Sequence, residues 1–286
     1  MFIPKRKELL LSSKLSAIQR AFEYGKELGF QYLNIKERAY TSSILRGRSF
    51  EEVLNHSKAI YFSVALHLPL QSVIQDMEFF FQHNKWNGEA LQNIMLKYDA
   101  TPEMFYHRLT NVLPRFFGIR KMFFLRFVHD PIKGTFDVDK ELHLNHKHHP
   151  HGNGIYEHYC RRWISIALLQ ELFQLKQAGH PSDLLISAQI SHYLNTTDQY
   201  LCFTVARPSY PSPNKNVSVT IGLLIYDELR AKVHFLNDPA IPARDVHTTC
   251  ERCSIEDCVE RAAEPSIVQK KQQFQQIQDR LNKLLN

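Results

Sequence analysis

The sequence predicts an α+β protein with a mostly helical N-terminal half and a mixed α/β C-terminal half that closes on a zinc knuckle. Three observations lead to this class. Before Gly118, apolar residues recur every three or four positions, as on amphipathic helices. After Gly118, runs rich in β-branched and aromatic residues alternate with turn-forming stretches, which is typical of strands. Near the C-terminus, three cysteines follow one another in the string CERCSIEDC.

Five helices are expected in the N-terminal half, and the segment 102–113 has the clearest start. Thr101 can cap this helix, Pro102 fits its first position, and the carboxylate of Glu103 favours its first turn. The other helices are expected at 8–29, 50–67, 71–82 and 87–98. Gly29 is expected to end the first of them, because glycine commonly follows the last helical turn.

The C-terminal half is expected to hold strands and helices that alternate with turns. The expected strands are 121–128, 184–190, 199–206, 217–226 and 231–236. The expected helices are 155–175 and the amphipathic segment 267–285. Residues 129–155 look like a loop. These patterns divide the chain into a helical domain, a mixed α/β domain and a C-terminal helix, with bounds 1–118, 119–266 and 267–286.

The bulk properties favour a globular protein of the cytosol. The 286 residues carry a formal charge of +6 and 44% hydrophobic residues, which is enough to bury a core. No apolar run reaches the roughly 18–20 residues that span a bilayer, so no membrane partner is expected. The basic N-terminus is interrupted by serines and a lysine, unlike a secretory signal. The mild positive charge is compatible with a nucleic acid or another anionic ligand.

The five cysteines, an odd number, argue against a disulfide framework and for a metal site or buried thiols. Cys250 and Cys253 form a C-x2-C pair, which lets one tight turn supply two zinc ligands. Cys258 can be the third ligand, and the charged residues around these thiols argue against simple burial. For the fourth ligand the sequence offers His247 or Cys160. A zinc ion with four protein ligands has no open position, so its role is structural.

Other patterns favour structural interpretations. Cys202 lies within an expected strand and is expected in the core. Residues 91–109 resemble two helices joined by a short turn, but the second helix carries few base-reading side chains, so a helical core pair is favoured over a DNA reader. A solvated loop is favoured over a metal site for the cluster His143, His146, His148, His149 and His151. The sequence contains no H-E-x-x-H, Gly-rich phosphate loop or G-x-S-x-G motif.

Four strings resemble segments of one family of bacterial transcription regulators, and their order along the chain matches the order in that family. CERCSIEDCVERAAEP resembles the signature C-R-x-C-x-R-x-x-C-x-x-R-A-x-P that closes the short-chain fatty acyl-coenzyme A regulators. EHYCRRW resembles their internal G-x-x-C-x-x-W segment. KAIYFSVALHLPL and YDATPEMFYHRL resemble pieces of the preceding zinc-peptidase-like domain of the ImmA/IrrE type. The resemblance covers roughly residues 15–266.

The resemblance implies the effector half of a regulator, a zinc-stapled sensor of an acyl-coenzyme A-type ligand. Because Cys160 falls where the family has a cysteine, the implied zinc ligands are Cys160, Cys250, Cys253 and Cys258. His247 stays in reserve. Guanidinium groups bind phosphate by charge-assisted hydrogen bonds. The arginines expected to meet the ligand's phosphates are Arg161, Arg162 and Arg207. For the first two, a solvated helix face is an equal interpretation.

Two departures from the family pattern change the expected activity. The peptidase motif H-E-L-G-H falls on residues 26–30, where Glu27 remains but both histidine ligands are lost. The acidic ligand expected three residues before Ala59 falls on His56. A catalytic zinc needs about three protein ligands, so we expect a peptidase fold without peptidase activity. The family's N-terminal helix-turn-helix has no room before these helices, so DNA binding is expected only through a missing domain or a partner.

Two rival functions stay open. A metallopeptidase could assemble zinc from Glu27, His56 and a histidine of 143–151. An interaction module could form a homodimer through the apolar stripe of 267–285 without any small ligand. Docking of this stripe on its own domain is at least as well supported as dimerisation.

Overall fold

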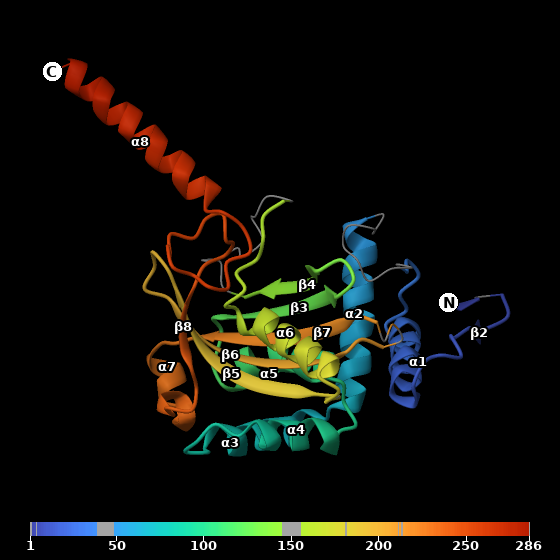
Figure 1. Ribbon diagram of the computed structural model, residues 1–286. Helices are drawn as coiled ribbons and strands as arrows, with labels where there is room; N and C mark the ends of the chain where they lie inside the picture. The colour runs from blue at the N-terminus through green and yellow to red at the C-terminus, as the bar shows by residue number, and fades with distance from the viewer. Residues whose placement is uncertain are drawn as a thin grey trace.

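The computed structural model describes residues 2–3, 5–38, 49–144, 156–180, 182–210, 212 and 214–285. Within these residues the chain combines a layer of helices with a β-sheet, which confirms the predicted α+β class. Figure 1 shows the sheet at the centre, with α6 across it and α8 pointing away from the body of the molecule. None of the helices in the described part of the chain is both long and apolar enough to cross a bilayer.

A six-stranded sheet forms the centre of the described structure. Its order is β4-β3-β7-β6-β5-β8, and neighbouring strands are antiparallel except for the parallel pair β5 and β8. The strands are β3 (Met122–Asp130), β4 (Thr135–His143), β5 (Leu185–Tyr193), β6 (Gln199–Pro208), β7 (Asn216–Leu224) and β8 (Ala243–Val246). β6 and β7 lie in the middle and are rich in apolar residues, because protein covers them on both faces.

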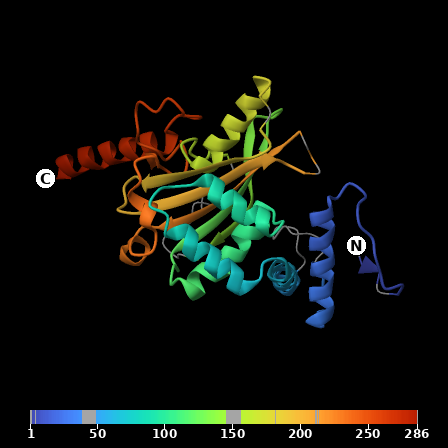
Figure 2. The same cartoon turned by 90° about the horizontal axis from the view of Figure 1, so that it is seen from below.

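The helices of the N-terminal half cover one face of this sheet. They are α1 (Ala17–Tyr32), α2 (Phe50–His67), α3 (Leu70–Phe81), α4 (Gly88–Lys97) and α5 (Pro102–Phe116). α5 packs on β3 and β7, α4 packs on β5, α2 leans on α5, and α1 pairs with α2. Figure 2, which views the molecule from below, shows α3 to α5 in front of the sheet. The expected cap of α5 is confirmed, since Thr101 Oγ1 accepts the Met104 N–H at 3.3 Å.

Strand β6 shows how the sheet separates two hydrophobic cores. Leu201 and Phe203 face the helical layer and join the larger core. Cys202 faces the smaller core under α6 (Ile164–Gln177) and is 3% exposed, as expected for a core thiol. The larger core combines residues of α3 and α5 with residues of β3 and β7, so its packing continues across the expected boundary at Gly118.

Helix α1 starts later than the expected range of 8–29. Ser16 caps it in a capping box: Ser16 Oγ accepts the Gln19 N–H at 3.3 Å, and Gln19 Oε1 accepts the Ser16 N–H at 3.0 Å. The preceding residues form a short hairpin of β1 (Phe2–Ile3) and β2 (Glu8–Leu9). The N-terminal half is therefore not helical throughout.

Gly29 does not end this helix, contrary to the expectation from sequence. It lies inside α1, where an added Cβ would come within 2.9 Å of the Phe62 Cβ on α2. Gly25, one turn earlier, faces Ser63 of α2 in the same way. The two glycines lie on one side of α1 and allow close approach to α2.

Three expectations for the C-terminal half are wrong. The range 129–155 contains strand β4, whose Phe136 packs toward the core while many of its other residues are charged and exposed, as on an edge strand. In place of the expected strand 231–236, the chain leaves the short helix α7 (Asp227–Arg230) through a turn and then forms the 3₁₀ turn η2 (His234–Asn237). Its apolar residues, such as Phe235, fill the core from a turn. The helix expected from residue 155 begins only at Ile164.

The C-terminal helix α8 (Ser266–Leu285) confirms the expected final helix. Its N-terminus is tied to the body, because the Ile267 N–H donates to the Glu251 carbonyl at 3.0 Å. Residues 269–284 are exposed, including the apolar side chains Phe274, Ile277 and Leu281. The apolar stripe is therefore not packed on the rest of the described chain, as Figure 1 also shows.

Candidate functional site

Two segments that are far apart in the sequence meet at the cysteines. The Cys160 N–H donates to the Thr248 carbonyl at 3.2 Å, and the Cys250 N–H donates to the His158 carbonyl at 2.8 Å. An antiparallel bridge joins the residues between them. The segment just before α6 therefore runs beside the segment that carries the C-x2-C pair. Cys253 follows by a turn, in which its N–H donates to the Cys250 carbonyl at 3.2 Å.

The thiols in this region are unpaired, and backbone N–H groups approach them. Cys160, Cys250 and Cys253 are each 5% exposed. Burial raises the pKa of Cys160 to about 11, although hydrogen bonds from the backbone of His247 and Arg162 counteract this by favouring the thiolate. The Cys250 Sγ accepts the N–H of residue 262 at 3.3 Å. The backbone hydrogen bonds to Cys160 favour its thiolate form, which is the form that binds zinc.

The four cysteines share one region but do not form a closed ligand set. Across the described ranges, no group of three or more histidine, cysteine, aspartate or glutamate residues is gathered closely enough to hold a metal ion. Cys258 is half-buried, and Cys253 contributes to the raised pKa of its thiol, after burial as the main cause. Four sulfur donors fit the chemistry of structural zinc. The zinc knuckle expected from the sequence is nevertheless not shown here and remains a proposal.

His247, the alternative fourth ligand, lies in the same region, and one of its ring nitrogens accepts a hydrogen bond. Its Nδ1 accepts the Thr248 N–H at 2.8 Å. Burial lowers the pKa of its imidazole, and the positive charges of Arg252 and Lys271 lower it further. A neutral imidazole can be a metal ligand through the other nitrogen.

Ion pairs also hold the two cysteine segments together. Arg252 Nε and Nη2 donate to the two carboxylate oxygens of Glu157, each at 2.7 Å. The carboxylate of Glu251 accepts the His158 N–H at 2.9 Å, and His158 Nδ1 lies 2.7 Å from Glu251 Oε1. Arg261 donates to the Cys250 carbonyl at 3.1 Å. The charges that surround the cysteines in the sequence therefore dock this segment on the domain.

The three arginines expected at a ligand site are not brought together. The guanidinium of Arg161 lies over the Phe136 ring, 4.3 Å from its centroid, on the side of the sheet that carries α6. The Arg162 carbonyl accepts from Gln189 on the same side at 3.1 Å, and Arg162 Nε is buried without a hydrogen-bond partner among the described residues. Arg207 lies on the opposite side of the sheet, under the helical layer.

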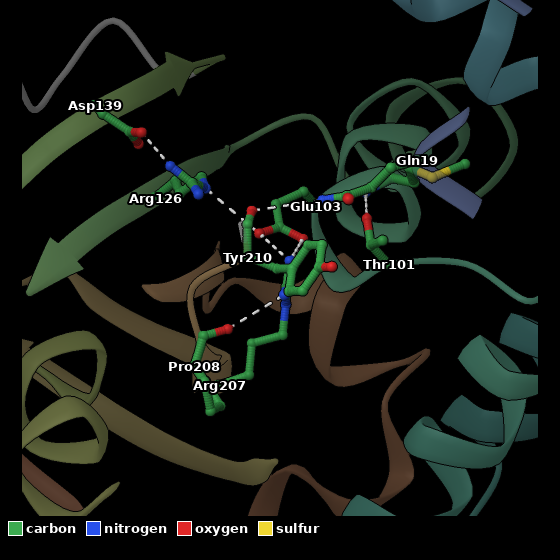
Figure 3. A network of polar contacts seen from close by, with 9 residues as sticks. Gln19, Thr101, Glu103, Arg126, Asp139, Arg207, Pro208 and Tyr210 are labelled. Carbon is green, nitrogen blue, oxygen red and sulfur yellow. Dashed lines mark hydrogen bonds and ion pairs between the residues drawn. The ribbon is translucent and has the colours of Figure 1, made fainter. Parts of the chain in front are cut away.

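Arg207 belongs to a polar network that sequence reasoning missed. Figure 3 shows Glu103, from the start of α5, between Arg207 and Arg126, and Arg126 reaching on to Asp139. Arg207 Nη2 lies 2.9 Å from both oxygens of Glu103, and Arg126 Nε lies 3.4 Å from Glu103 Oε1. Burial alone would raise the pKa of Glu103, but Arg207 and Arg126 together outweigh it and lower the pKa. Sequence could not find this network, because its members lie on α5, β6, β3 and β4.

A cavity of about 350 Å³ opens beside this network, between the starts of α1 and α5 and the end of β6. Gln19, Thr101, Arg207 and Tyr210 are among its lining residues. Gln19 Nε2 donates to the Tyr210 carbonyl at 3.4 Å. An anion in this cavity would have to compete with Glu103 for the guanidinium of Arg207. The network therefore holds the helical layer on the sheet and leaves no unpaired guanidinium for a ligand.

Two residues at the positions of the peptidase motif, Lys26 and Glu27, form ion pairs. Lys26 Nζ lies 2.5 Å from Glu23 Oε2 on α1. Glu27 is held by Arg38, whose Nη1 lies 2.6 Å from Glu27 Oε2. Phe30 is buried at 4% exposure. Each of these positions therefore has a structural role in this conformation.

The remaining expected sites are placed as follows. Of the histidine cluster, His143 ends β4, while residues 146, 148, 149 and 151 lie outside the described residues. The helix pair expected at 91–109 corresponds to α4 and the first half of α5. Arg108 of this pair donates to the Leu68 carbonyl at 3.1 Å and to Tyr61 Oη at 2.6 Å, and it is 5% exposed. Such a buried arginine cannot read a base edge, which agrees with the helical core pair.

No protein-family model and no curated protein matches this chain. The family resemblance therefore rests on the quoted strings alone.

Proposed function

We propose that this chain is the ligand-sensing part of a cytosolic bacterial transcription regulator that resembles the short-chain fatty acyl-coenzyme A regulators. The observation that supports it is the meeting of Cys160 with the Cys250 and Cys253 segment. The resemblance assigned these cysteines to one site although they are far apart in the sequence. A chance likeness of short strings gives no reason for the two segments to pair by backbone hydrogen bonds.

The proposed zinc ligands are Cys160, Cys250, Cys253 and Cys258, with His247 in reserve. When bound, zinc would supply a structural cross-link rather than a reactive centre. A link from Cys160 to Cys250 closes a loop of about 90 residues, which in the chain-entropy picture restricts the unfolded chain strongly. It would fix the start of α6 against the segment that follows β8.

The proposed ligand is a short-chain acyl-coenzyme A or a related metabolite. Of the three expected arginines, Arg207 is paired with Glu103 and Arg161 covers Phe136. Arg162 keeps a buried Nε without a partner in the described part of the chain, so it is the arginine best suited to a phosphate. In this proposal, contact with DNA is made through a further domain or a partner.

Measurement of the zinc content of the purified chain tests the proposed zinc site. We expect one zinc per chain, with loss or weakening in Cys160→Ser and no change in Cys202→Ser, a matched variant whose thiol lies within β6. Zinc that survives Cys160→Ser and is lost in His247→Ala would move the fourth ligand to His247. A purified chain that binds no zinc would contradict the proposed structural zinc site.

The ligand class is tested separately by melting temperature. Butyryl- or propionyl-coenzyme A is expected to raise the Tm of the wild type, because a ligand that binds only the folded state stabilises it. The shift should be smaller in Arg162→Ala than in Arg161→Ala. No shift with any short-chain acyl-coenzyme A would favour an interaction module without a small ligand.

The exposed apolar stripe of α8 favours a second candidate function, that of an interaction module without a small ligand. Phe274, Ile277, Leu281 and Leu284 recur at spacings of three and four, which is the seam of a coiled coil, and all are more than half exposed. A second copy of the chain would cover this seam. Light scattering on the wild type and on Leu281→Lys tests it, since a lysine at the seam should convert a dimer into a monomer.

A further inference from the structure

The cavity of about 350 Å³ between the starts of α1 and α5 and the end of β6 is large enough for a small ligand. Small-molecule sites in proteins commonly measure roughly 300–1,000 Å³. Residues from four separate stretches of the chain line this cavity. Figure 3 shows three of the residues, Gln19, Thr101 and Arg207, around Tyr210. A ligand in the cavity would therefore meet side chains that only the fold brings together.

Contacts within the chain hold the wall of this cavity in place. The capping box of Ser16 and Gln19 fixes the start of α1, and Gln19 Nε2 donates to the Tyr210 carbonyl at 3.4 Å. The contacts of Arg207 with Glu103 fix the start of α5 on β6. The cavity is thus largely formed before a ligand arrives, as small-molecule sites usually are.

Several polar groups of the wall still have hydrogen-bonding capacity. A hydroxyl group offers one donor and two acceptor positions. Ser16 Oγ and Thr101 Oγ1 each use one acceptor position to cap a helix, both at 3.3 Å, so each O–H group can donate to a ligand. Within the described part of the chain, the hydroxyls of Ser209 and Tyr210 and the carboxylate of Asp183 make no hydrogen bond.

The charges around the cavity favour an uncharged ligand. The guanidinium of Arg207 is bound by the carboxylate of Glu103, so it does not attract an anion strongly. The carboxylate of Asp183 lines the same cavity and would repel an anion. A metal ion also fits poorly, because across the described ranges no group of three or more histidine, cysteine, aspartate or glutamate residues could hold one.

An exposed aromatic side chain adds an apolar surface to this polar wall. Tyr210 is 51% exposed, and it lines the cavity together with the apolar side chains of Ile18 and Pro208. A sugar ring has hydroxyl groups around its edge and C–H groups on its two faces. The hydroxyls of such a ring match the free polar groups of the wall, and its faces match the apolar side chains.

We propose that this cavity binds an uncharged monosaccharide. The carboxylate of Asp183 accepts hydrogen bonds from sugar hydroxyls, and the O–H groups of Ser16 and Thr101 donate to sugar oxygens. The ring of Tyr210 covers one face of the sugar. Arg207 keeps its pair with Glu103 when the sugar binds. The inference requires neither an acyl-coenzyme A ligand nor a zinc ion.

Titration of the full chain with D-glucose, D-galactose, D-mannose, N-acetyl-D-glucosamine and D-ribose, followed by saturation-transfer NMR, tests the proposal. We expect saturable binding of at least one of these sugars. Asp183→Asn should weaken the Kd by about tenfold, because the charge-assisted hydrogen bonds are lost. Asp279→Asn is the matched control, since it removes the same charge from an exposed position of α8 and should leave the Kd unchanged.

A second pair of variants tests the aromatic surface. Tyr210→Ala should also weaken the Kd, because it removes the ring that covers the sugar. Tyr156→Ala removes a ring that is 91% exposed and does not line the cavity, so it should have no effect. Asp183 and Tyr210 are both exposed, and their variants should therefore keep the wild-type Tm in the absence of sugar.

Three results would overturn the proposal. They are the absence of saturable binding for all five sugars, a Kd that Asp183→Asn and Tyr210→Ala leave unchanged, and tighter binding of D-glucose 6-phosphate than of D-glucose. The last result would show that the cavity attracts an anion. The zinc content and the effect of acyl-coenzyme A on the Tm are measured separately, so failure here and failure of the proposed function can be told apart.

Discussion

Arg207 on β6 and Glu103 on α5 are joined by two contacts, because Arg207 Nη2 lies 2.9 Å from each carboxylate oxygen. The Glu103 side chain is only 16% exposed. Arg126 approaches the same carboxylate from β3. This carboxylate ties the first turn of a layer helix to two strands of the sheet. Removal of one member of a buried ion pair is strongly destabilising, since the other charges stay desolvated.

Glu103→Gln is therefore expected to lower the free energy of unfolding by about 3 kcal/mol, measured by urea denaturation at neutral pH. Glu89→Gln is the matched control. Glu89 holds the second position of α4, as Glu103 does in α5, but it is exposed. Its loss should lower stability by only a few tenths of a kcal/mol through the helix dipole. Equal losses of stability in the two variants would show that the ion pairs of Glu103 do not hold α5 on the sheet.

Acid is expected to destabilise the fold through His107. Burial, and secondarily Lys140, lower the pKa of its imidazole to about 4 in the folded chain, against 6.5 when unperturbed. Between these values the unfolded chain binds more protons than the folded one, so the free energy of unfolding falls as pH is lowered through this window.

His107→Gln should remove this contribution and flatten the pH dependence of urea midpoints between about pH 6.5 and pH 4. His180→Gln, at an exposed position, should leave the slope unchanged. The same slope in wild type and His107→Gln would mean that this imidazole does not titrate as described.

Gly25→Ala is expected to loosen the contact between α1 and α2. An added Cβ would come within 2.5 Å of Ser63 Oγ, which itself donates to the Phe22 carbonyl at 2.7 Å. We expect a loss of about 1–3 kcal/mol from overpacking, although alanine alone would favour a helix by about 1 kcal/mol. The double variant Gly25→Ala with Ser63→Gly should recover much of the loss in urea denaturation. A single variant more stable than wild type would show that helix propensity outweighs packing.

Truncation after Lys270 is expected to leave the Tm unchanged. From Lys271 to Leu284 the side chains of α8 are exposed, so they add little to the folded body. Light scattering on the same sample shows whether the helix carries self-association. A clear fall in Tm for a monomeric sample would mean that α8 packs on its own domain.

Short-range sequence signals predicted those helices whose formation depends on residues close together in the chain. The start of α5 follows from Thr101 and Pro102, and the apolar spacing of 267–285 correctly predicts a helix. The start of α1 was missed although Ser16 and Gln19 carry a capping-box signal. The strand β4 was missed because only alternate residues such as Phe136 are apolar, and charges fill the rest.

The sequence by itself determined the α+β class, most of the helices, the central strands, and the resemblance that singled out four cysteines. Those features depend on interactions between neighbours in the chain, or on short strings read directly. Only the tertiary structure decided that the segment of Cys160 lies beside the segment of Cys250 and that Arg207 is bound to Glu103. These contacts join residues from separate strands and helices, and long-range packing alone brings such residues together, since the hydrophobic effect that drives it is non-directional and leaves no local pattern in the sequence.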